Sequence, residues 1–207
     1  MIKVAVTMRI TEAADYHEPR DSISHDWLNI LPAWGMTPLP VPNIGNEAVS
    51  YLDFLKPDLL ILSGGDDIGT APARDETEYA LLRKALSTGL PVFGVCRGLQ
   101  LINTFFGGTI AEVSGHVAKS HTVNITTEWR SFFASETIVN SFHNRCIPAD
   151  SLAADLHATA YDTTGNIEGF RHMEKPLAAV MWHPERNEAP KGDYALVQSL
   201  IGLRGTN

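Results

Sequence analysis

A cysteine stands between two glycines in the segment Gly94-Val95-Cys96-Arg97-Gly98. An apolar run precedes the segment and an amphipathic run follows it. The pattern therefore matches the G-x-S-x-G turn that presents a nucleophile between a strand and a helix, with a thiol in place of the hydroxyl. The dipole at the start of the helix favours the thiolate, which is the nucleophilic form. A buried structural cysteine is the alternative. We assign that role to Cys146, which lacks this context, and expect Cys96 to be a nucleophile.

A thiol nucleophile needs a base, and the base needs a partner that fixes its tautomer. The segment Met181-Trp182-His183-Pro184-Glu185 supplies both groups at the end of another strand-like run. A carboxylate there can accept a hydrogen bond from one imidazole nitrogen while the other nitrogen faces the sulfur. A surface turn would explain the segment alone, but its combination with the cysteine turn favours His183 as the base and Glu185 as its partner.

Attack of a thiolate on an amide creates a negative oxygen, which requires N–H donors in fixed positions. Ser63-Gly64-Gly65-Asp66 follows a buried apolar run and offers a flexible glycine backbone. We expect the oxyanion hole to consist of the backbone N–H groups of Gly65 and of Arg97, the residue directly after the nucleophile. An ordinary Gly-Gly turn is the alternative interpretation.

Short apolar runs alternate with amphipathic stretches, which predicts an α/β fold with a mostly parallel central sheet flanked by helices. Strands are expected at residues 3–8, 37–42, 58–63 and 91–95, the second of them a proline-marked edge strand. Helices are expected at 22–34, 47–55, 75–87, 97–106 and 194–203. Strand-like runs at 121–126, 137–141, 156–161, 167–171 and 177–182, with a hairpin turn at 162–166, indicate a small antiparallel addition. No linker is evident, so we expect a single domain over residues 1–207.

Composition narrows the class of partner. The chain has 207 residues and a net charge of −8, without a long run of Lys or Arg, which argues against binding to bulk nucleic acid. No apolar run approaches the length that crosses a membrane, and the N-terminus resembles a first strand more than a signal peptide. Two cysteines without such a signal fit a reducing compartment, so we expect a cytoplasmic protein. Whether it forms a homodimer stays open.

The motifs GVCRGLQ, SGGDD and WHPE, in their order along the chain, resemble those of the class I glutamine amidotransferase superfamily. The resemblance implies a flavodoxin-like core and no metal or cofactor. It implies a triad of Cys96, His183 and Glu185 that cleaves a γ-glutamyl amide through a thioester. The small-molecule γ-glutamyl substrate would be bound by Gly64 and Gln100, and by a loop resembling the family's glutamyl-binding loop, of which we select Ser141, Phe142, Asn144 and Arg145.

Within the superfamily the chain is similar to stand-alone γ-glutamyl hydrolases. It reads Phe142-His143-Asn144 where the γ-glutamyl-γ-aminobutyrate hydrolases tend to show His-His-Gln. The runs 7–10, 15–21 and 25–27, together with SFHN, FRH and MWH followed by Glu185-Arg186, resemble the γ-glutamyl-CDP-amidate hydrolases of bacterial capsule biosynthesis. That resemblance implies release of glutamate and cytidine diphosphoramidate. The γ-aminobutyrate-type substrate, a glutaminase subunit that serves a synthase, and a catalytically inactive binding protein are the alternatives.

Two further groups of residues have competing interpretations. Arg9 and Arg20 follow the first strand and could bind phosphate or carboxylate in a bidentate way, or they could lie on a solvated loop. His116 and His121 are five residues apart and could suggest a metal, but no set of Cys or carboxylate residues completes a site, so we interpret them as structural or as part of the rim of the pocket.

Overall fold

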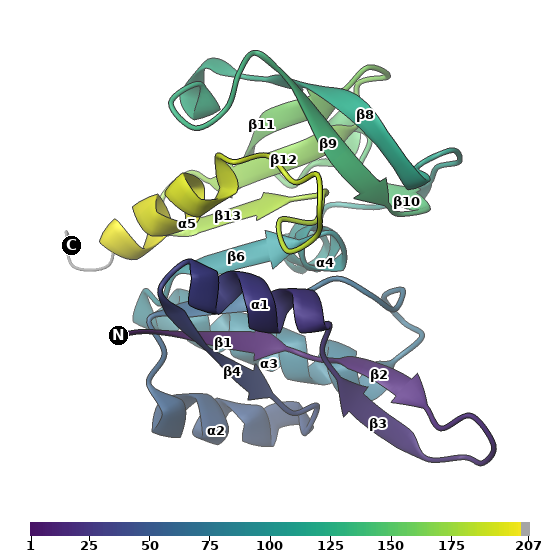
Figure 1. The fold of residues 1–207 in the computed structure, drawn as a ribbon, viewed down its shortest axis with the longest axis vertical. Coiled ribbons are helices and arrows are strands. Elements are labelled where there is room, and N and C mark those ends of the chain that lie inside the picture. The colour runs from purple at the N-terminus through teal and green to yellow at the C-terminus, as the bar shows by residue number, and fades with distance from the viewer. Residues whose placement is uncertain (204–207) are drawn as a thin grey trace.

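A computed structural model describes residues 1–203, and its centre is a nine-stranded sheet. Five neighbouring strands of the sheet pair in parallel: β4 (Met36–Val41), β1 (Ile2–Thr7), β5 (Leu59–Leu62), β6 (Val92–Val95) and β13 (Leu177–Val180). The sheet continues with antiparallel pairing through β12 (Ile167–His172), β11 (Leu156–Asp162), β8 (Val117–Ile125) and β9 (Glu136–Phe142). Figure 1 shows this second half of the sheet above β6.

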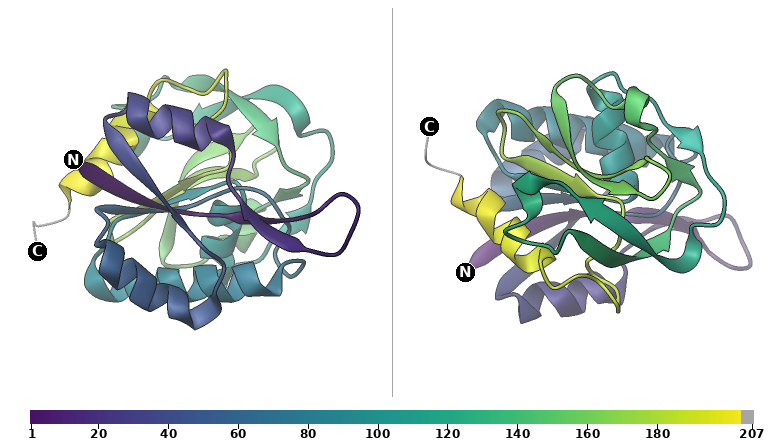
Figure 2. Two further views of the ribbon diagram at one scale, coloured as in Figure 1. Left: turned by 60° about the horizontal axis from the view of Figure 1, so that its bottom comes forward. Right: turned by 90° about the horizontal axis from the view of Figure 1, so that it is seen from above.

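Helices cover both faces of the parallel half. α1 (His25–Ala33) and α5 (Asp193–Gly202) lie on one face, and α2 (Ala48–Leu55), α3 (Pro72–Thr88) and α4 (Arg97–Phe105) lie on the other (Figure 2). This arrangement follows from right-handed crossovers between parallel strands, because the chain moves one way from β1 to β4 and the opposite way from β4 to β5. Short 3-10 turns at Gly45–Glu47, Thr127–Trp129 and Ala149–Ser151 complete the elements of the helical type.

The hydrophobic core lies along the central strands. Every residue of β5, β6 and β13 is buried, which is the pattern of strands covered on both faces. A fully buried aliphatic side chain contributes about 1.5–3 kcal/mol relative to an exposed one. These strands therefore form a rigid base from which the loops at their carboxyl ends project. No helix among residues 1–203 is both long and apolar enough to cross a membrane.

The two edges of the sheet differ. β4 forms one edge and carries Pro38 and Pro40, which pair in register with Val4 and Val6 of β1. β9 forms the other edge and contains no proline, and its Ile138 is 68% exposed. The prediction of an edge strand near residues 37–42 is therefore confirmed.

The predicted α/β class is confirmed, with two differences in detail. Four of the five strand-like runs expected in the antiparallel addition form β8, β9, β11 and β12, whereas the fifth, at 177–182, forms β13 and pairs in parallel with β6. The region after β1, predicted to be a loop, forms a hairpin of β2 (Arg9–Glu12) and β3 (Pro19–Ser22) that projects from the body of the molecule in Figure 1. The helix predicted from residue 22 begins later because the Ser24 side chain caps it by accepting from the Asp26 N–H. A two-stranded pair of β7 (Ala111–Glu112) and β10 (Arg145–Cys146) was also missed.

Candidate active site

The candidate residues meet at the carboxyl ends of parallel strands. Cys96 directly follows β6, the segment from Ser63 follows β5, and His183 lies three residues beyond β13. Parallel strands that are neighbours in a sheet end at the same edge, and ligands of open α/β sheets bind there. The fold therefore brings together motifs that are up to 120 residues apart in the sequence, from Ser63 to His183.

Cys96 occupies a strained backbone conformation, with φ 52° and ψ −101°, between β6 and α4. A non-glycine residue in this region costs roughly 1–3 kcal/mol and persists where the surroundings enforce it. The flanking glycines allow the close packing that does so. A Cβ on Gly98 would lie 2.1 Å from the Leu62 carbonyl oxygen, and a Cβ on Gly94 would lie 2.6 Å from Cδ1 of Ile102. The two glycines of the motif are therefore required by packing between α4 and the sheet.

His183 and Glu185 form a buried pair in which Nδ1 of the imidazole lies 2.7 Å from Oε1 of the carboxylate. Burial alone would lower the pKa of His183, but the neighbouring Cys96 and Glu185 side chains outweigh it and raise the pKa to about 9. Nε2 of the ring is buried and has no hydrogen-bond partner among residues 1–203. With Nδ1 committed to Glu185, Nε2 is the nitrogen that is available for proton transfer to and from a reacting group.

The backbone of His183 is held by Asn140, a residue of β9 to which the sequence interpretation gave no such role. The His183 N–H donates to Oδ1 of Asn140 over 2.8 Å, and Nδ2 of Asn140 donates to the His183 carbonyl over 3.0 Å. Both partners are buried. The side chain thus acts as a two-way clamp on the residue that carries the imidazole. Its separation of 43 residues in the sequence left no local signal for it.

The glycine loop after β5 is held by Arg74, which is completely buried in α3. Its guanidinium donates to the carbonyl oxygens of Ser63, Gly64 and Gly65 over 2.8, 3.1 and 3.1 Å. In a trans peptide the C=O and the following N–H point in opposite directions. Arg74 therefore directs the N–H groups of Gly65 and Asp66 away from itself. Gly65 has φ +96°, a conformation that favours glycine.

The same network reaches the second expected oxyanion donor. Nε of Arg74 donates to Glu78 over 3.0 Å, and Glu78 also accepts from the guanidinium of Arg97, which pairs with Asp75 as well. Burial would lower the pKa of Arg74, but its carboxylate partners Glu78 and Asp66 outweigh burial and raise it. One ionic network of α3 and α4 thus supports both backbone segments predicted to bind an oxyanion.

A cavity of about 150 Å³ opens beside the sulfur. Six of the predicted site residues line it, namely Gly65, Cys96, Arg97, Gln100, Phe142 and Asn144; Asp66, Asp67 and His143 complete the lining. Gly64 lies just outside, packed so closely on the imidazole that a Cβ would come within 2.7 Å of Cε1 of His183.

Two predicted substrate contacts have other partners. The hydroxyl of Ser141 is buried and donates to the His116 carbonyl over 2.5 Å. The Arg145 side chain lies near Asp67 and Glu112, at 3.9 and 3.6 Å, while its carbonyl accepts from Nε2 of Gln100 over 3.4 Å. These two residues shape the loop and its rim, and neither lines the cavity beside Cys96.

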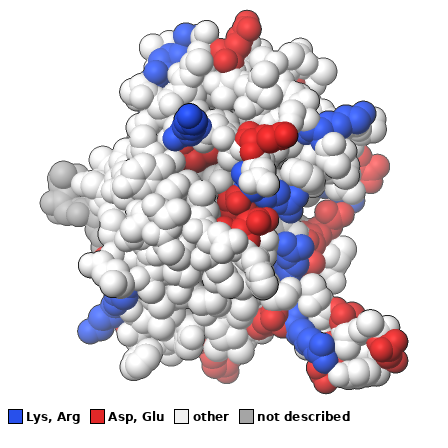
Figure 3. Space-filling view, viewed as in Figure 1, with Lys and Arg blue, Asp and Glu red and all other residues white. Residues whose placement is uncertain are grey.

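On the other side of the imidazole, Arg9 and Arg186 line a narrow cleft that also includes His183 and Glu185. Arg186 and Phe142 further line a groove of about 390 Å³ that contains Lys119, and the Arg186 guanidinium lies 4.0 Å from the centre of the Phe142 ring. In Figure 3 charged side chains of both signs gather on the side of the molecule toward the β2–β3 hairpin.

Arg20 has a different position from Arg9. It lies on β3 of the projecting hairpin and pairs with Glu18 and Tyr16 at 2.5 and 2.8 Å. Arg20 lines neither the cleft nor the groove nor the cavity. The solvated-loop alternative therefore fits Arg20 better than a role in binding.

The expectation that no carboxylate completes a set with His116 and His121 is wrong, because the fold places Glu168 beside them. Glu168 of β12 lies 3.5 Å from Nε2 of His121, and 3.6 Å from Nε2 of His143. Burial raises the pKa of Glu168, lowers that of His116, and lowers that of His143 to about 4. For His121, burial lowers the pKa, but the nearby carboxylate of Glu168 outweighs it and raises the pKa overall.

Fold and site together define the class of glutamine amidotransferase-like α/β proteins, in which a cysteine turn, a glycine loop and a His–Glu pair share one sheet edge. The chain belongs to the Peptidase C26 family, whose model matches residues 1–185.

Individual relatives agree with this assignment. The gamma-glutamyl-CDP-amidate hydrolase of Campylobacter jejuni is 30% identical over 193 residues, which cover 88% of this chain and 90% of that protein. The protein YvdE of Lactococcus lactis, which carries a glutamine amidotransferase-like name, is 32% identical over 176 residues, or 71% and 72% of the two chains. A crystal structure described as that of a GMP synthase subunit from Thermoplasma acidophilum aligns with a TM-score of 0.75 at 25% identity, covering 98% of this chain and 93% of that one.

Proposed function

We propose that the chain is a cysteine-dependent γ-glutamyl amide hydrolase. The observation that carries the proposal is the position of Cys96, strained at the start of α4, beside the buried pair of His183 and Glu185. Membership of the Peptidase C26 family supports a hydrolytic or amidotransferase activity, and the Campylobacter jejuni relative supports a γ-glutamyl substrate.

In the proposed reaction the Cys96 thiolate attacks the γ-carbonyl carbon, and the N–H groups of Gly65 and Arg97 bind the resulting oxyanion. Collapse of this intermediate breaks the C–N bond, and protonated His183 donates its proton to the leaving nitrogen. A γ-glutamyl thioester remains. Water then attacks the thioester while neutral His183 accepts its proton, and glutamate and the thiolate are released. Glu185 holds the imidazole tautomer throughout.

The glutamyl half fits the cavity beside Cys96. Its lining includes the polar side chains of Gln100 and Asn144. At the mouth, Asp67 and Arg145 lie 3.9 Å apart and present one charge of each sign. A free glutamyl group carries an α-ammonium and an α-carboxylate, so this pair complements both charges.

The leaving group would then extend across the imidazole toward the cleft and groove. A cytidine diphosphoramidate leaving group carries a diphosphate, and a chain of net charge −8 needs local cations to bind it. Arg9 and Arg186 line the cleft, and Lys119 lies in the adjoining groove. We therefore propose γ-glutamyl-CDP-amidate as the substrate, and the name of the Campylobacter jejuni relative supports this choice.

The test compares γ-glutamyl-CDP-amidate with a small neutral γ-glutamyl anilide. Cys96→Ala should abolish hydrolysis of both substrates and leave the circular-dichroism spectrum unchanged. Arg9→Ala should reduce kcat/KM for the CDP-amidate by about tenfold or more, because charge-assisted contacts to phosphate are worth about 1.5–3 kcal/mol, and should barely change the anilide.

Arg20→Ala is the matched control, since it removes the same charge from the exposed hairpin. Equal losses on both substrates in Arg9→Ala would refute phosphate recognition. A wild type that prefers γ-glutamyl-γ-aminobutyrate would refute the leaving group alone, and turnover by pure Cys96→Ala would refute the whole mechanism.

A glutaminase subunit is the second candidate, because the structural relative from Thermoplasma acidophilum, which covers 98% of this chain, carries the description of a GMP synthase subunit. Such a protein would release glutamate from glutamine itself. Efficient hydrolysis of glutamine and none of larger γ-glutamyl amides, measured with the purified chain, would favour this candidate.

A further inference from the structure

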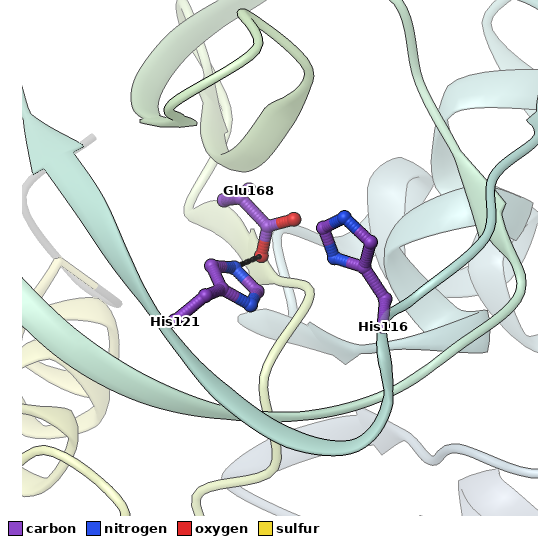
Figure 4. A group of neighbouring side chains, drawn as sticks. All are labelled: His116, His121 and Glu168. Atoms are coloured by element: carbon purple, nitrogen blue, oxygen red, sulfur yellow. Dashed lines mark ion pairs between the residues drawn. The ribbon is translucent and has the colours of Figure 1, made fainter.

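A second group of polar side chains, two buried and two half-buried, adjoins the proposed glutamyl cavity. His116 lies just before β8, His121 within β8, His143 just after β9, and Glu168 on β12. One ligand-type atom from each of His116, His121 and Glu168 lies within 4.8 Å of those of the other two. Figure 4 shows the Glu168 carboxylate between the two imidazole rings.

Several buried polar atoms of this group have no hydrogen-bond partner. Both carboxylate oxygens of Glu168 and the Nε2 atoms of His121 and His143 are buried and have no hydrogen-bond partner among residues 1–203. Nδ1 of His116 has none either. Burying unpaired polar atoms costs about 1–3 kcal/mol each and more for a charged group. A buried set of this size therefore calls for a ligand that joins its members.

The tautomer of His143 shows what kind of ligand fits. Its Nδ1 lies 2.8 Å from the Arg145 carbonyl oxygen, which can only accept, so Nδ1 carries the proton. In the neutral ring Nε2 then presents a lone pair toward an oxygen of Glu168, 3.6 Å away. Two lone pairs that face each other repel unless a proton or a metal cation lies between them. A histidine whose other ring N–H donates to a backbone carbonyl is also the usual arrangement of a metal ligand.

We propose that His116, His121 and Glu168, with His143 as a fourth ligand, form a binding site for a divalent transition-metal cation, with Zn²⁺ the best match. Imidazole and carboxylate ligands bind Zn²⁺ tetrahedrally at about 2.0–2.2 Å, which places neighbouring ligand atoms roughly 3.3–3.6 Å apart. The separations from Glu168 to His121 and His143, 3.5 and 3.6 Å, already have this size.

The cation has no part in the proposed bond cleavage, and its place relative to the loop after β9 suggests a supporting role. The His116 carbonyl accepts from the Ser141 hydroxyl over 2.5 Å and from the His143 N–H over 3.4 Å. His143 itself lines the cavity beside Cys96. A cation at this position would therefore join the start of β8 to the loop that borders the cavity.

The experiment measures Zn²⁺ binding in a Cys96→Ala background, because the thiolate beside His183 would offer Zn²⁺ a second site. Protein freed of metal by a chelator is titrated with Zn²⁺ alone against a chromophoric chelator. We expect one equivalent per chain, and dissociation constants raised by about tenfold or more in Glu168→Gln and His121→Asn. His157→Asn should bind as the background does, because that histidine is exposed and pairs with Glu128.

Melting temperatures without metal establish which variants are folded. Absence of saturable Zn²⁺ binding in the folded Cys96→Ala protein, or unchanged affinity in folded Glu168→Gln, would overturn the proposal. A second measurement does not depend on any ligand variant: Co²⁺ added to Cys96→Ala should show the intense ligand-field absorption of a four-coordinate site. A spectrum of the hydrated ion would overturn the proposal equally.

Discussion

His183 and Glu185 differ in what their removal should cost. His183→Ala removes the group that transfers protons in both half-reactions, whereas Glu185→Gln keeps an acceptor for Nδ1 and loses the charge. We expect kcat to fall by roughly 10²- to 10⁴-fold in Glu185→Gln and by more, about 10⁶-fold, in His183→Ala. Steady-state kinetics on any γ-glutamyl substrate measures the difference, and a reversed order would show that the roles are misassigned.

Glu185→Gln also has an expected signature in the pH dependence. Glu185 is one of the groups that raise the pKa of His183 to about 9, so its neutralisation lowers that pKa. The alkaline limb of the kcat/KM profile, where imidazolium is lost, should therefore move to lower pH. Glu174→Gln, an exposed carboxylate, is the control and should leave the limb in place.

Among individual residues, those that belong to short sequence motifs could mostly be predicted. Cys96, His183 and the glycine loop could be predicted because each motif includes its own turn residues. Asn140 and Glu168 could not be assigned their contacts, because their partners lie 25 residues away or more along the chain. Arg20 resembled a ligand in sequence, but the hairpin carries it away from the cleft.

At the scale of elements, Arg74 is a positioning residue that joins α3 to the glycine loop. Arg74→Lys keeps the charge but cannot donate to three carbonyl oxygens and a carboxylate from one planar group. We expect kcat to fall by about tenfold or more because the oxyanion donor at Gly65 is no longer fixed, while KM changes little. Stability should also fall, by about 1–3 kcal/mol.

The split between kcat and KM separates positioning from a merely structural effect. Arg83→Lys is the matched control, since Arg83 lies on the same helix but is exposed. If kcat for the folded Arg74→Lys protein equalled that of the wild type, Arg74 would serve stability alone.

The element boundaries explain what the sequence pattern could and could not show. Strands buried on both faces, such as β5 and β6, appear as continuous apolar runs and were predicted close to their limits. No residue of β2 or β3 is fully buried, so the hairpin has no hydrophobic alternation that would indicate a strand. Its pairing is held by backbone hydrogen bonds that composition does not reveal.

At the scale of the whole molecule, Asp193 should make stability depend on pH. The side chain is buried at the start of α5, and its Oδ1 accepts from Nε1 of Trp182 over 3.0 Å. Burial, with a contribution from the charge of Glu185, raises the pKa of Asp193 to about 8. The unfolded chain ionises near its usual value of about 3.9, so the folded state holds the proton more tightly and loses stability as pH rises from about 4 to 8.

Asp193→Asn removes this dependence and keeps the acceptor for Trp182. The difference in unfolding free energy, variant minus wild type, should therefore be larger at pH 8 than at pH 5 by more than about 1 kcal/mol, as measured by urea unfolding at each pH. His183, whose raised pKa makes stability fall between about 6.5 and 9, is present in both proteins and cancels in the difference. Asp15→Asn on the exposed hairpin should show no such trend, and a difference that is equal at both pH values would contradict the prediction.

The unequal edges of the central sheet have a consequence for crowded solutions. In a parallel pair, the residues whose N–H groups do not face the neighbouring strand direct them outward. Proline has no N–H, so an incoming strand would find no donors at Pro38 and Pro40 of β4. β9 has no such protection, and its exposed Ile138 offers apolar surface as well. Aggregation by pairing of the central sheet with a second chain, in the cell or in a concentrated preparation, is therefore expected to begin at β9. A lysine in place of Ile138 would discourage such pairing.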